Sequence, residues 1–233
     1  MLLPVIIPYG RILFILLSYL FMLSFNCIRN SYYNFKKLNV FILTTLTMIF
    51  GIIGTIILYN IENPEKFFSI GTSLYGAIIF IPVFFMFIKL IYKRFKYLDI
   101  LNFIAPTILV VIAIMRINCT LSGCCRGIEF EFGIKYENIT RFPVQPIEAL
   151  LDLIAFAFLY LNERKSIFVV NNYFLLIIVY PIIRLICELF RDEKKVFIGL
   201  STGQIISIIL LIIGVVLLIV SLMNKRKLKD KHY

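Results

Sequence analysis

The sequence has no tryptophan, a single histidine and few charged residues. Only 16% of its 233 residues are charged, whereas 61% are hydrophobic, and the mean hydropathy is +0.96. A water-soluble domain needs a larger polar surface, so this composition excludes an ordinary soluble protein and favours lipid as the main solvent. Without tryptophan, any aromatic belt must come from tyrosine and phenylalanine. The lone His232 lies in a basic tail, which excludes a histidine-rich metal site.

Acidic residues are also scarce, which leaves a formal net charge of +11. Such a charge could indicate nucleic-acid binding. The basic residues, however, stand in short runs between apolar stretches of membrane-spanning length. We therefore expect them to face anionic lipid headgroups, with no nucleic-acid partner.

Seven apolar segments approach the length of roughly 20 residues that a membrane-spanning helix needs. They run over Leu2–Phe25, Val40–Tyr59, Ile70–Ile91, Leu98–Asn118, Pro146–Leu161, Asn172–Phe190 and Thr202–Met223. The start of the chain lacks a basic region and a small-residue cleavage site, so we expect the first segment to be retained. With no internal repeat, we predict one all-α, polytopic membrane domain over residues 1–233, ending in a basic cytoplasmic tail at 224–233.

Lysines and arginines in the short loops predict the orientation of the bundle. Placing the N-terminus outside and the C-terminus inside gives the cytoplasmic side roughly a two-to-one excess of basic residues. Arg29 and the basic tail are among the cytoplasmic residues in this arrangement. The longest loop, about 119–145, then faces outward together with the loop after Phe190.

The sixth segment carries a polar stripe inside a predicted span. Tyr180, Arg184, Glu188 and Arg191 are spaced four, four and three residues apart, which places them on one helix face. Arg184 and Glu188 can pair at i, i+4. Interfacial snorkelling could explain Arg191 alone, but charges deep in a span usually mark function.

Arg116, near the outer end of the fourth segment, could be an interfacial anchor. It precedes a short run in which Gly123 and Gly127 flank two cysteines and allow tight turns. Two arginines from different helices can grip one phosphate, because guanidinium forks match its oxygens. We therefore predict that Arg116 and Arg184 form a phosphate clamp.

The starts of the fifth and seventh segments hold further polar candidates. Glu148 either complements its helix dipole or acts in the cavity as a base or hydrogen-bond acceptor, whereas Asp152 on the same face favours a structural role. Ser201 or Thr202 can cap the seventh helix. Gln204 fits either capping or the site.

Cysteines number five, and their spacing matches no small disulfide framework. Three of them, Cys119, Cys124 and Cys125, fall in or beside the longest loop. A zinc site usually has a fourth protein ligand and paired CxxC spacing, so we expect small buried thiols and no metal. A disulfide is the alternative if the loop is extracytoplasmic.

Four ordered pieces between residues 98 and 214 resemble the prolipoprotein diacylglyceryl transferase family. Asp99 to Pro106 resembles its Asp-x-x-Ala-Pro entry to the fourth span, and Arg116 to Gly127 resembles its Arg-x-x-Asn-x-x-x-Gly-Glu-x-x-Gly signature. Phe142 to Glu148 is similar to its His-Pro-Thr-Gln-Leu-Tyr-Glu motif. The stretches 180–191 and 200–204 are similar to its final Tyr-x-x-x-Arg-x-x-x-Glu and Ser-x-Gly-Gln elements.

The resemblance implies a transferase of the bacterial cytoplasmic membrane, with no cofactor. It would move diacylglycerol from phosphatidylglycerol to a cysteine thiol in a prolipoprotein signal peptide. Arg116 and Arg184 would hold the phosphate. The residues that the resemblance places around them, as catalytic groups or in contact with substrate, are Tyr180, Glu188, Glu148, Gln145, Tyr75, Gly123, Gly127, Gln204 and Arg191.

Several positions depart from the family pattern. Tyr75 stands where the family has a histidine, Phe142 replaces another, and Cys119, Ser122 and Cys124 stand where it has Asn, Asn and Glu. Two alternatives therefore stay open. One is a related membrane transferase with another thiol or hydroxyl acceptor, using Cys124 or Cys125 as a covalent relay. The other is a non-catalytic protein that binds or transports an anionic lipid or solute.

Overall fold

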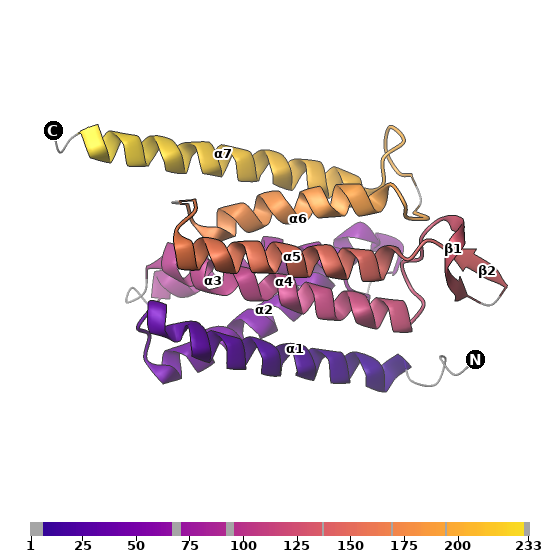
Figure 1. Ribbon diagram of the computed structural model, residues 1–233, viewed down its shortest axis with the longest axis horizontal. Helices are drawn as coiled ribbons and strands as arrows, with labels where there is room; N and C mark the ends of the chain where they lie inside the picture. The colour runs from indigo at the N-terminus through magenta and orange to yellow at the C-terminus, as the bar shows by residue number, and fades with distance from the viewer. Residues whose placement is uncertain are drawn as a thin grey trace.

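The computed structural model describes residues 7–66, 71–91, 96–136, 138–168, 170–193 and 195–230. Within these ranges the chain forms seven α-helices and one β-hairpin (Figure 1). The helices are α1 (Ile7–Arg29), α2 (Lys37–Glu62), α3 (Tyr75–Ile91), α4 (Tyr97–Leu121), α5 (Val144–Lys165), α6 (Asn172–Glu188) and α7 (Thr202–Asp230). Short 3-10 turns follow α1 at Asn30–Tyr32 and α2 at Pro64–Lys66.

The helices confirm the prediction of an all-α, multi-pass membrane protein. Each predicted span overlaps one helix, although parts of the first and third spans fall on residues 2–6 and 70, outside the described ranges. Five helices, α1, α2, α4, α5 and α7, are long and apolar enough to cross a membrane by length and composition. The shortest of the predicted spans extends further than expected, because α5 continues to Lys165.

Helix α4 lies at the centre of the bundle. In its most apolar stretch of 18 residues, about two thirds of the residues are buried, whereas the share is 17% to 39% in the other four long helices. It packs against α1, α5 and α6, and its buried face carries Phe103, Ile104 and Leu109. The outer helices keep apolar side chains exposed, as expected for helices that face lipid.

Two glycines bring α2 and α3 into close backbone contact. A Cβ atom on Gly54 would lie 2.5 Å from the Gly76 carbonyl oxygen, and one on Gly76 would lie 2.1 Å from the Gly54 oxygen. Small residues at such crossings let membrane helices approach closely enough for good van der Waals packing. This contact fixes the start of α3, where Tyr75 is found.

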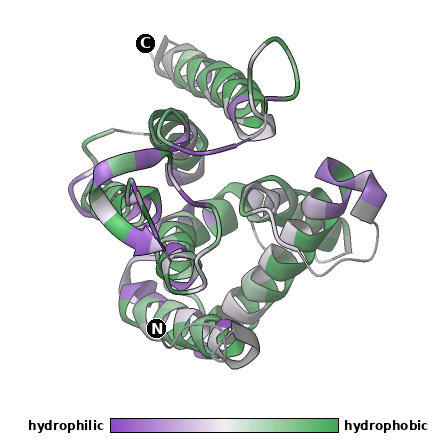
Figure 2. Ribbon diagram, turned by 90° about the vertical axis from the view of Figure 1, so that its right-hand side faces the viewer, coloured by the Kyte–Doolittle hydropathy of each residue, from purple (hydrophilic) through white to green (hydrophobic). Residues whose placement is uncertain are grey.

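The loop between α4 and α5 contains a hairpin that the sequence analysis did not predict. Strand β1 (Glu129–Tyr136) pairs antiparallel with β2 (Ile139–Arg141), with an irregularity between Glu129 and Ile134. Seen from the hairpin end, hydrophobic residues predominate on the helices, and hydrophilic residues gather on the hairpin and neighbouring loops (Figure 2). The chain leaves the opposite end of the bundle through α7.

The hairpin loop and the segment after α6 lie together, as predicted. Gly127 forms an antiparallel bridge with Arg191. The Ile128 amide donates to the Phe190 carbonyl at 3.0 Å, and the Asp192 amide donates to the Arg126 carbonyl at 3.2 Å. These backbone bonds hold both segments over the same end of the bundle.

A fully buried arginine at the opposite end was not anticipated. The sequence analysis grouped Arg29 with the basic loop residues, but its guanidinium forms a two-pronged pair with Glu163 of α5. It also donates to the Asn26 side chain at 3.1 Å and to the Phe103 carbonyl at 2.9 Å. Three aromatic rings surround the guanidinium. A charge can be buried here because every guanidinium nitrogen has an acceptor.

Candidate active site

Glu148, on the second turn of α5, forms ion pairs with three arginines. Its carboxylate is fully buried. The partners are Arg116 of α4 at 2.8 Å, Arg184 of α6 at 3.3 Å and Arg191, just after α6, at 2.7 Å. The two arginines predicted as a phosphate clamp therefore do converge, and a shared carboxylate holds them together.

Glu188 forms the second half of this cluster. It forms an ion pair with Arg184 at 3.1 Å, which confirms the predicted i, i+4 pair, and it lies 3.5 Å from the Nε atom of Arg191. Arg191 is buried, so it does not snorkel to the interface. Three arginines face these two glutamates, and Glu193 lies 4.0 Å from Arg191 as a third carboxylate. The Nε atoms of Arg116, Arg184 and Arg191 are buried and make no hydrogen bond within the described residues, so the hydrogen bonding of the cluster is incomplete.

A cavity of about 970 Å³ opens beside the cluster. Arg116, Arg184 and Arg191 line it, and Arg11 of α1 adds a fourth guanidinium. Glu193 also lies on the cavity wall, and burial raises the pKa of its carboxyl, while Arg191 acts in the opposite direction. A volume of this size holds a lipid headgroup rather than a single ion.

Two tyrosines stand behind the arginines. Tyr75 of α3 hydrogen-bonds to the Ser207 hydroxyl and donates to the Gly203 carbonyl at 3.2 Å. Its ring lies under Arg184 and meets the ring of Tyr180 edge to face at 5.4 Å. Tyr180 is fully buried, and its hydroxyl has no hydrogen-bond partner within the described ranges. Tyr75 therefore joins α3 to α7 through hydrogen bonds, whereas the Tyr180 hydroxyl makes none within the described ranges.

The start of α7 connects directly to Glu188. The backbone N–H of Gln204 donates to the Ser201 hydroxyl oxygen at 3.2 Å. The backbone N–H of Ser201 donates to the side-chain oxygen of Gln204 at 3.0 Å. This reciprocal pair is a capping box, so Gln204 serves the helix start. The Ser201 hydroxyl also donates to Glu188 at 2.8 Å. Gly203 is needed beside it, because a Cβ atom there would lie 2.9 Å from Glu188 Oε1.

The turn after α4 places the remaining predicted residues. Gly123 (φ +64°) and Cys125 (φ +55°) adopt left-handed backbone conformations, which reverse the chain sharply. Gln145 of α5 is buried and donates to the Cys124 carbonyl at 2.6 Å, which holds the turn against α5. A Cβ atom on Gly127 would lie 2.3 Å from the Phe142 carbonyl oxygen. Gln145, Gly123 and Gly127 thus shape the loop that covers the cluster.

All three predicted thiols lie on the cavity wall. Cys119, Cys124 and Cys125 line the cavity, and their sulfur atoms lie within 4.8 Å of one another. All three are free thiols, but Cys119 and Cys125 are only half-buried and Cys124 is exposed, so the expectation of buried thiols is wrong. Hydrogen bonds from the Cys119 and Cys124 thiols lower the pKa of Cys125, and the charges of Arg116 and Arg191 act in the same direction.

Sequence reasoning missed several residues of this site. Arg11 and Glu193 line the cavity, and Ser201 holds Glu188, yet only the cap signal at Ser201 was visible. Arg11 is the one charged residue in the first apolar segment, and a charge inside a predicted span is a second signal that the sequence offered. Asp152, expected to be structural, is buried, and neither carboxylate oxygen has a hydrogen-bond partner in the described parts of the chain.

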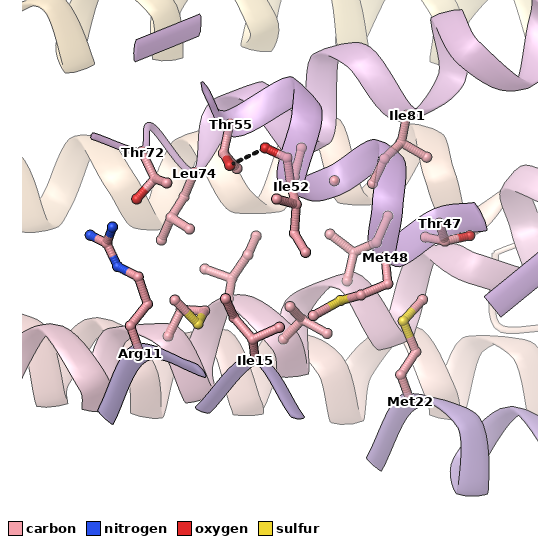
Figure 3. Close-up of a pocket in the computed structure, with 16 residues that line it drawn as sticks. Arg11, Ile15, Met22, Thr47, Met48, Ile52, Thr55, Thr72, Leu74 and Ile81 are labelled. Carbon is pink, nitrogen blue, oxygen red and sulfur yellow. Dashed lines mark hydrogen bonds between the residues drawn. The ribbon is translucent and has the colours of Figure 1, made fainter. Parts of the chain in front are cut away.

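A smaller apolar pocket of about 90 Å³ adjoins the polar cavity (Figure 3). Arg11, Thr72, Leu74 and Met115 line both. From Arg11 the pocket runs along α1 and α2 towards Met22, between apolar side chains such as Ile15 and Ile52. A charged headgroup region and an apolar extension are therefore continuous in this structure.

These features define a class: a multi-pass helical membrane protein with an arginine-rich polar cavity joined to an apolar pocket. Comparison with known proteins gives the particular family. The chain belongs to the prolipoprotein diacylglyceryl transferase family, whose family model matches residues 5–220. The predicted resemblance is confirmed, and the match extends well beyond the motifs between residues 98 and 214.

Several curated relatives carry one name, phosphatidylglycerol–prolipoprotein diacylglyceryl transferase. A protein of Clostridium perfringens, named with the same words followed by the number 2, is 30% identical over 217 residues, which cover 84% of this chain and 83% of the relative. One from Clostridium tetani is 29% identical over 198 residues, covering 76% and 78%. One from Francisella tularensis is 29% identical over 203 residues, covering 78% and 74%.

Proposed function

We propose that the protein transfers a diacylglyceryl group from phosphatidylglycerol to the cysteine thiol of prolipoprotein signal peptides in the bacterial cytoplasmic membrane. The observation that carries the proposal is the convergence of Arg116 from α4 with Arg184 and Arg191 from the end of α6 on one cavity. Membership of the family and the names of the relatives support the same reaction.

The reaction needs positive charge where the leaving group becomes free. When the thiolate attacks the glyceryl carbon, the C–O bond to phosphate breaks and glycerol phosphate departs with the electron pair. Guanidinium groups held before the reaction stabilise this developing charge without reorganising. Arg116 and Arg184 both line the cavity in which the phosphate would lie. Glu148 holds the arginines at fixed positions and does not itself contact the phosphate in this scheme.

The apolar pocket suits the other half of the donor lipid. Arg11 lies where the polar cavity meets this pocket, so a phosphate near the arginines would leave an acyl chain beside α1 and α2 (Figure 3). Burying an acyl chain contributes about 0.8 kcal/mol for each CH₂ group removed from water. With the N-terminus outside, as the loop charges predict, this cavity would face the outer leaflet.

A transfer assay tests the proposal. Purified full-length protein is incubated with labelled phosphatidylglycerol and a peptide that carries a signal-peptide cysteine. We expect label on the peptide, and we expect Arg116→Ala and Arg184→Ala each to lower the rate by about 10²–10³-fold. The matched control is Arg164→Ala, because Arg164 is an exposed arginine at the opposite end. Wild-type protein that moves no label, or clamp variants that transfer at the wild-type rate, would contradict the proposal.

A further inference from the structure

The three thiols on the cavity wall are brought together by the turn after α4. Cys119 lies in the last turn of the helix, and the left-handed residues Gly123 and Cys125 fold the chain back towards it. The Cys124 carbonyl is fixed by Gln145. Residues five and six positions apart thereby present their sulfur atoms within 4.8 Å of one another.

This spacing is close to that of a thiolate metal site. Zn–S bonds of 2.3 Å in a tetrahedron place neighbouring sulfur atoms about 3.8 Å apart, so small side-chain rotations close the remaining distance. Soft thiolate ligands select zinc over magnesium or calcium. Three protein ligands with one open position are typical of a zinc ion that works in chemistry, whereas structural zinc sites have four. Arg116 and Arg191 act electrostatically on Cys125, and they can offset the negative charge of three thiolates.

The acceptor thiol must lose a proton before it can attack, and the site offers few groups for that task. The chain has one histidine, His232, which lies outside the described residues. Glu148 and Glu188 are already engaged by arginines. Of the other carboxylates on the cavity wall, Glu62 accepts from Ser73 at 3.1 Å, and Glu193 is partly exposed. A metal ion removes the need for a base, because a thiol that binds zinc is deprotonated by coordination.

We propose that Cys119, Cys124 and Cys125 bind one zinc ion, whose open position takes the acceptor cysteine and delivers it as a thiolate. The role in transfer rests on the function proposed above. The acceptor S–H proton goes to water, the S–C bond to the glyceryl carbon forms, and the C–O bond to phosphate breaks. No electrons are exchanged with an outside reagent, and zinc keeps its charge throughout.

Metal binding is measured first, without reference to activity. Reduced full-length protein is titrated with Co²⁺, whose thiolate charge-transfer absorption reports sulfur ligands, and Zn²⁺ is then added in competition. We expect one equivalent of metal, bound at least about 100-fold more weakly in Cys119→Ser, Cys124→Ser and Cys125→Ser. Cys27→Ser is the matched control, because Cys27 is an exposed thiol on α1 outside the cluster. Wild-type protein that binds no Co²⁺ overturns the proposal.

The role in transfer is measured on protein depleted of metal. We expect transfer to fall by about 10²–10⁴-fold and to return with Zn²⁺, while phosphatidylglycerol binding through the arginines is retained. Undiminished transfer by the metal-free protein, or by a form with a disulfide among the three cysteines, overturns the proposal. A diacylglyceryl adduct on Cys124 or Cys125 before acceptor is added also overturns it, because that result shows a covalent relay. Loss of transfer in Glu62→Gln or Glu193→Gln, with metal-free wild-type protein active, assigns proton removal to that carboxylate.

The two proposals can fail separately. If the protein binds one equivalent of metal through the three thiols but the zinc-loaded form transfers nothing to the peptide, the metal site stands and the transfer function fails. If label moves at the same rate with and without metal, the transfer function stands and the zinc role fails.

Discussion

The two ends of the bundle solve the problem of a buried arginine in different ways. At the end where α1 and α5 finish, Arg29 has one carboxylate, two further acceptors and three aromatic rings, and no guanidinium nitrogen is left over. At the hairpin end, three arginines share two glutamates, and the Nε atoms of Arg116 and Arg184 have no hydrogen-bond partner within the described ranges. The hydrogen bonding of Arg29 is complete, whereas that of the three arginines is incomplete and their side chains line a cavity.

The difference separates a charge that stabilises the fold from charges that bind. A saturated pair gains nothing from a ligand, so its worth appears only in stability. An unsaturated cluster costs stability, and an anion that completes it returns part of that cost by mass action. Burial alone therefore does not identify the site, since Arg29 is more deeply buried than Arg184.

The largest effect is expected for Glu148→Gln. This change leaves three buried guanidiniums without their shared carboxylate, so we expect destabilisation of about 5 kcal/mol, the upper end of the range for breaking buried pairs. Thermal unfolding in detergent measures it. Phosphatidylglycerol added to the detergent is expected to raise the melting temperature of this variant more than that of wild type. Equal stabilisation of both would show that the arginines do not receive the lipid phosphate.

Glu163→Gln breaks the complete cluster and gives the contrasting result. We expect a loss of about 3 kcal/mol, the lower end of the same range, because Asn26 and the Phe103 carbonyl still accept from Arg29. Phosphatidylglycerol is expected to give no extra stabilisation, and transfer per folded molecule is expected to stay near the wild-type rate. The neighbouring exposed Arg164→Ala serves as the control. Rescue by lipid here would erase the distinction between the two ends.

Gly203→Ala tests how closely the carboxylates must be placed. The added Cβ would lie 2.9 Å from Glu188 Oε1 and 3.4 Å from an Arg184 nitrogen, so the Arg184–Glu188 pair has to shift. We expect transfer to fall by about 10–100-fold, the effect of misplacing a site by a fraction of an ångström to one ångström. Ile209→Ala, an exposed change on the same helix, is the control for general effects on α7. Wild-type kinetics in Gly203→Ala would show that Glu188 can move without cost.

Ser201→Ala is expected to have the smallest effect. It removes the cap of α7 and one hydrogen bond to Glu188, which together contribute about 1 kcal/mol to stability. The melting temperature measures this loss, and a modest rise in KM for the lipid is expected because Glu188 loses a fixed donor. Thr202→Ala leaves the cap intact. If both variants lose the same stability, the capping box does not hold the helix start.

Much of the architecture was predictable because lipid imposes a strong pattern on sequence. Long apolar stretches give the helices, and helical spacing gives the stripe on α6 with its Arg184–Glu188 pair. The partners of Arg116 were not predictable, because they depend on how α4, α5 and α6 pack. The hairpin was missed although the residues of β1 alternate between polar and apolar side chains, which is a pattern that predicts a strand. The position of Arg29 was predicted wrongly because the sequence around a helix end does not show whether the side chain points into the bundle or out of it.

The pairing of Arg184 with Glu148 has a consequence for biosynthesis. The 17-residue α6 is not one of the five helices that are long and apolar enough to cross a membrane alone, and it carries two charges in its second half. Inserting an arginine at the centre of a span costs about 2.5–3.5 kcal/mol in the translocon. Glu148 lies on α5, which precedes α6 and is joined to it by only a few residues. The cost of inserting Arg184 is therefore lowest when the two helices enter the bilayer together as a hairpin, because Glu148 can then pair with Arg184 during insertion.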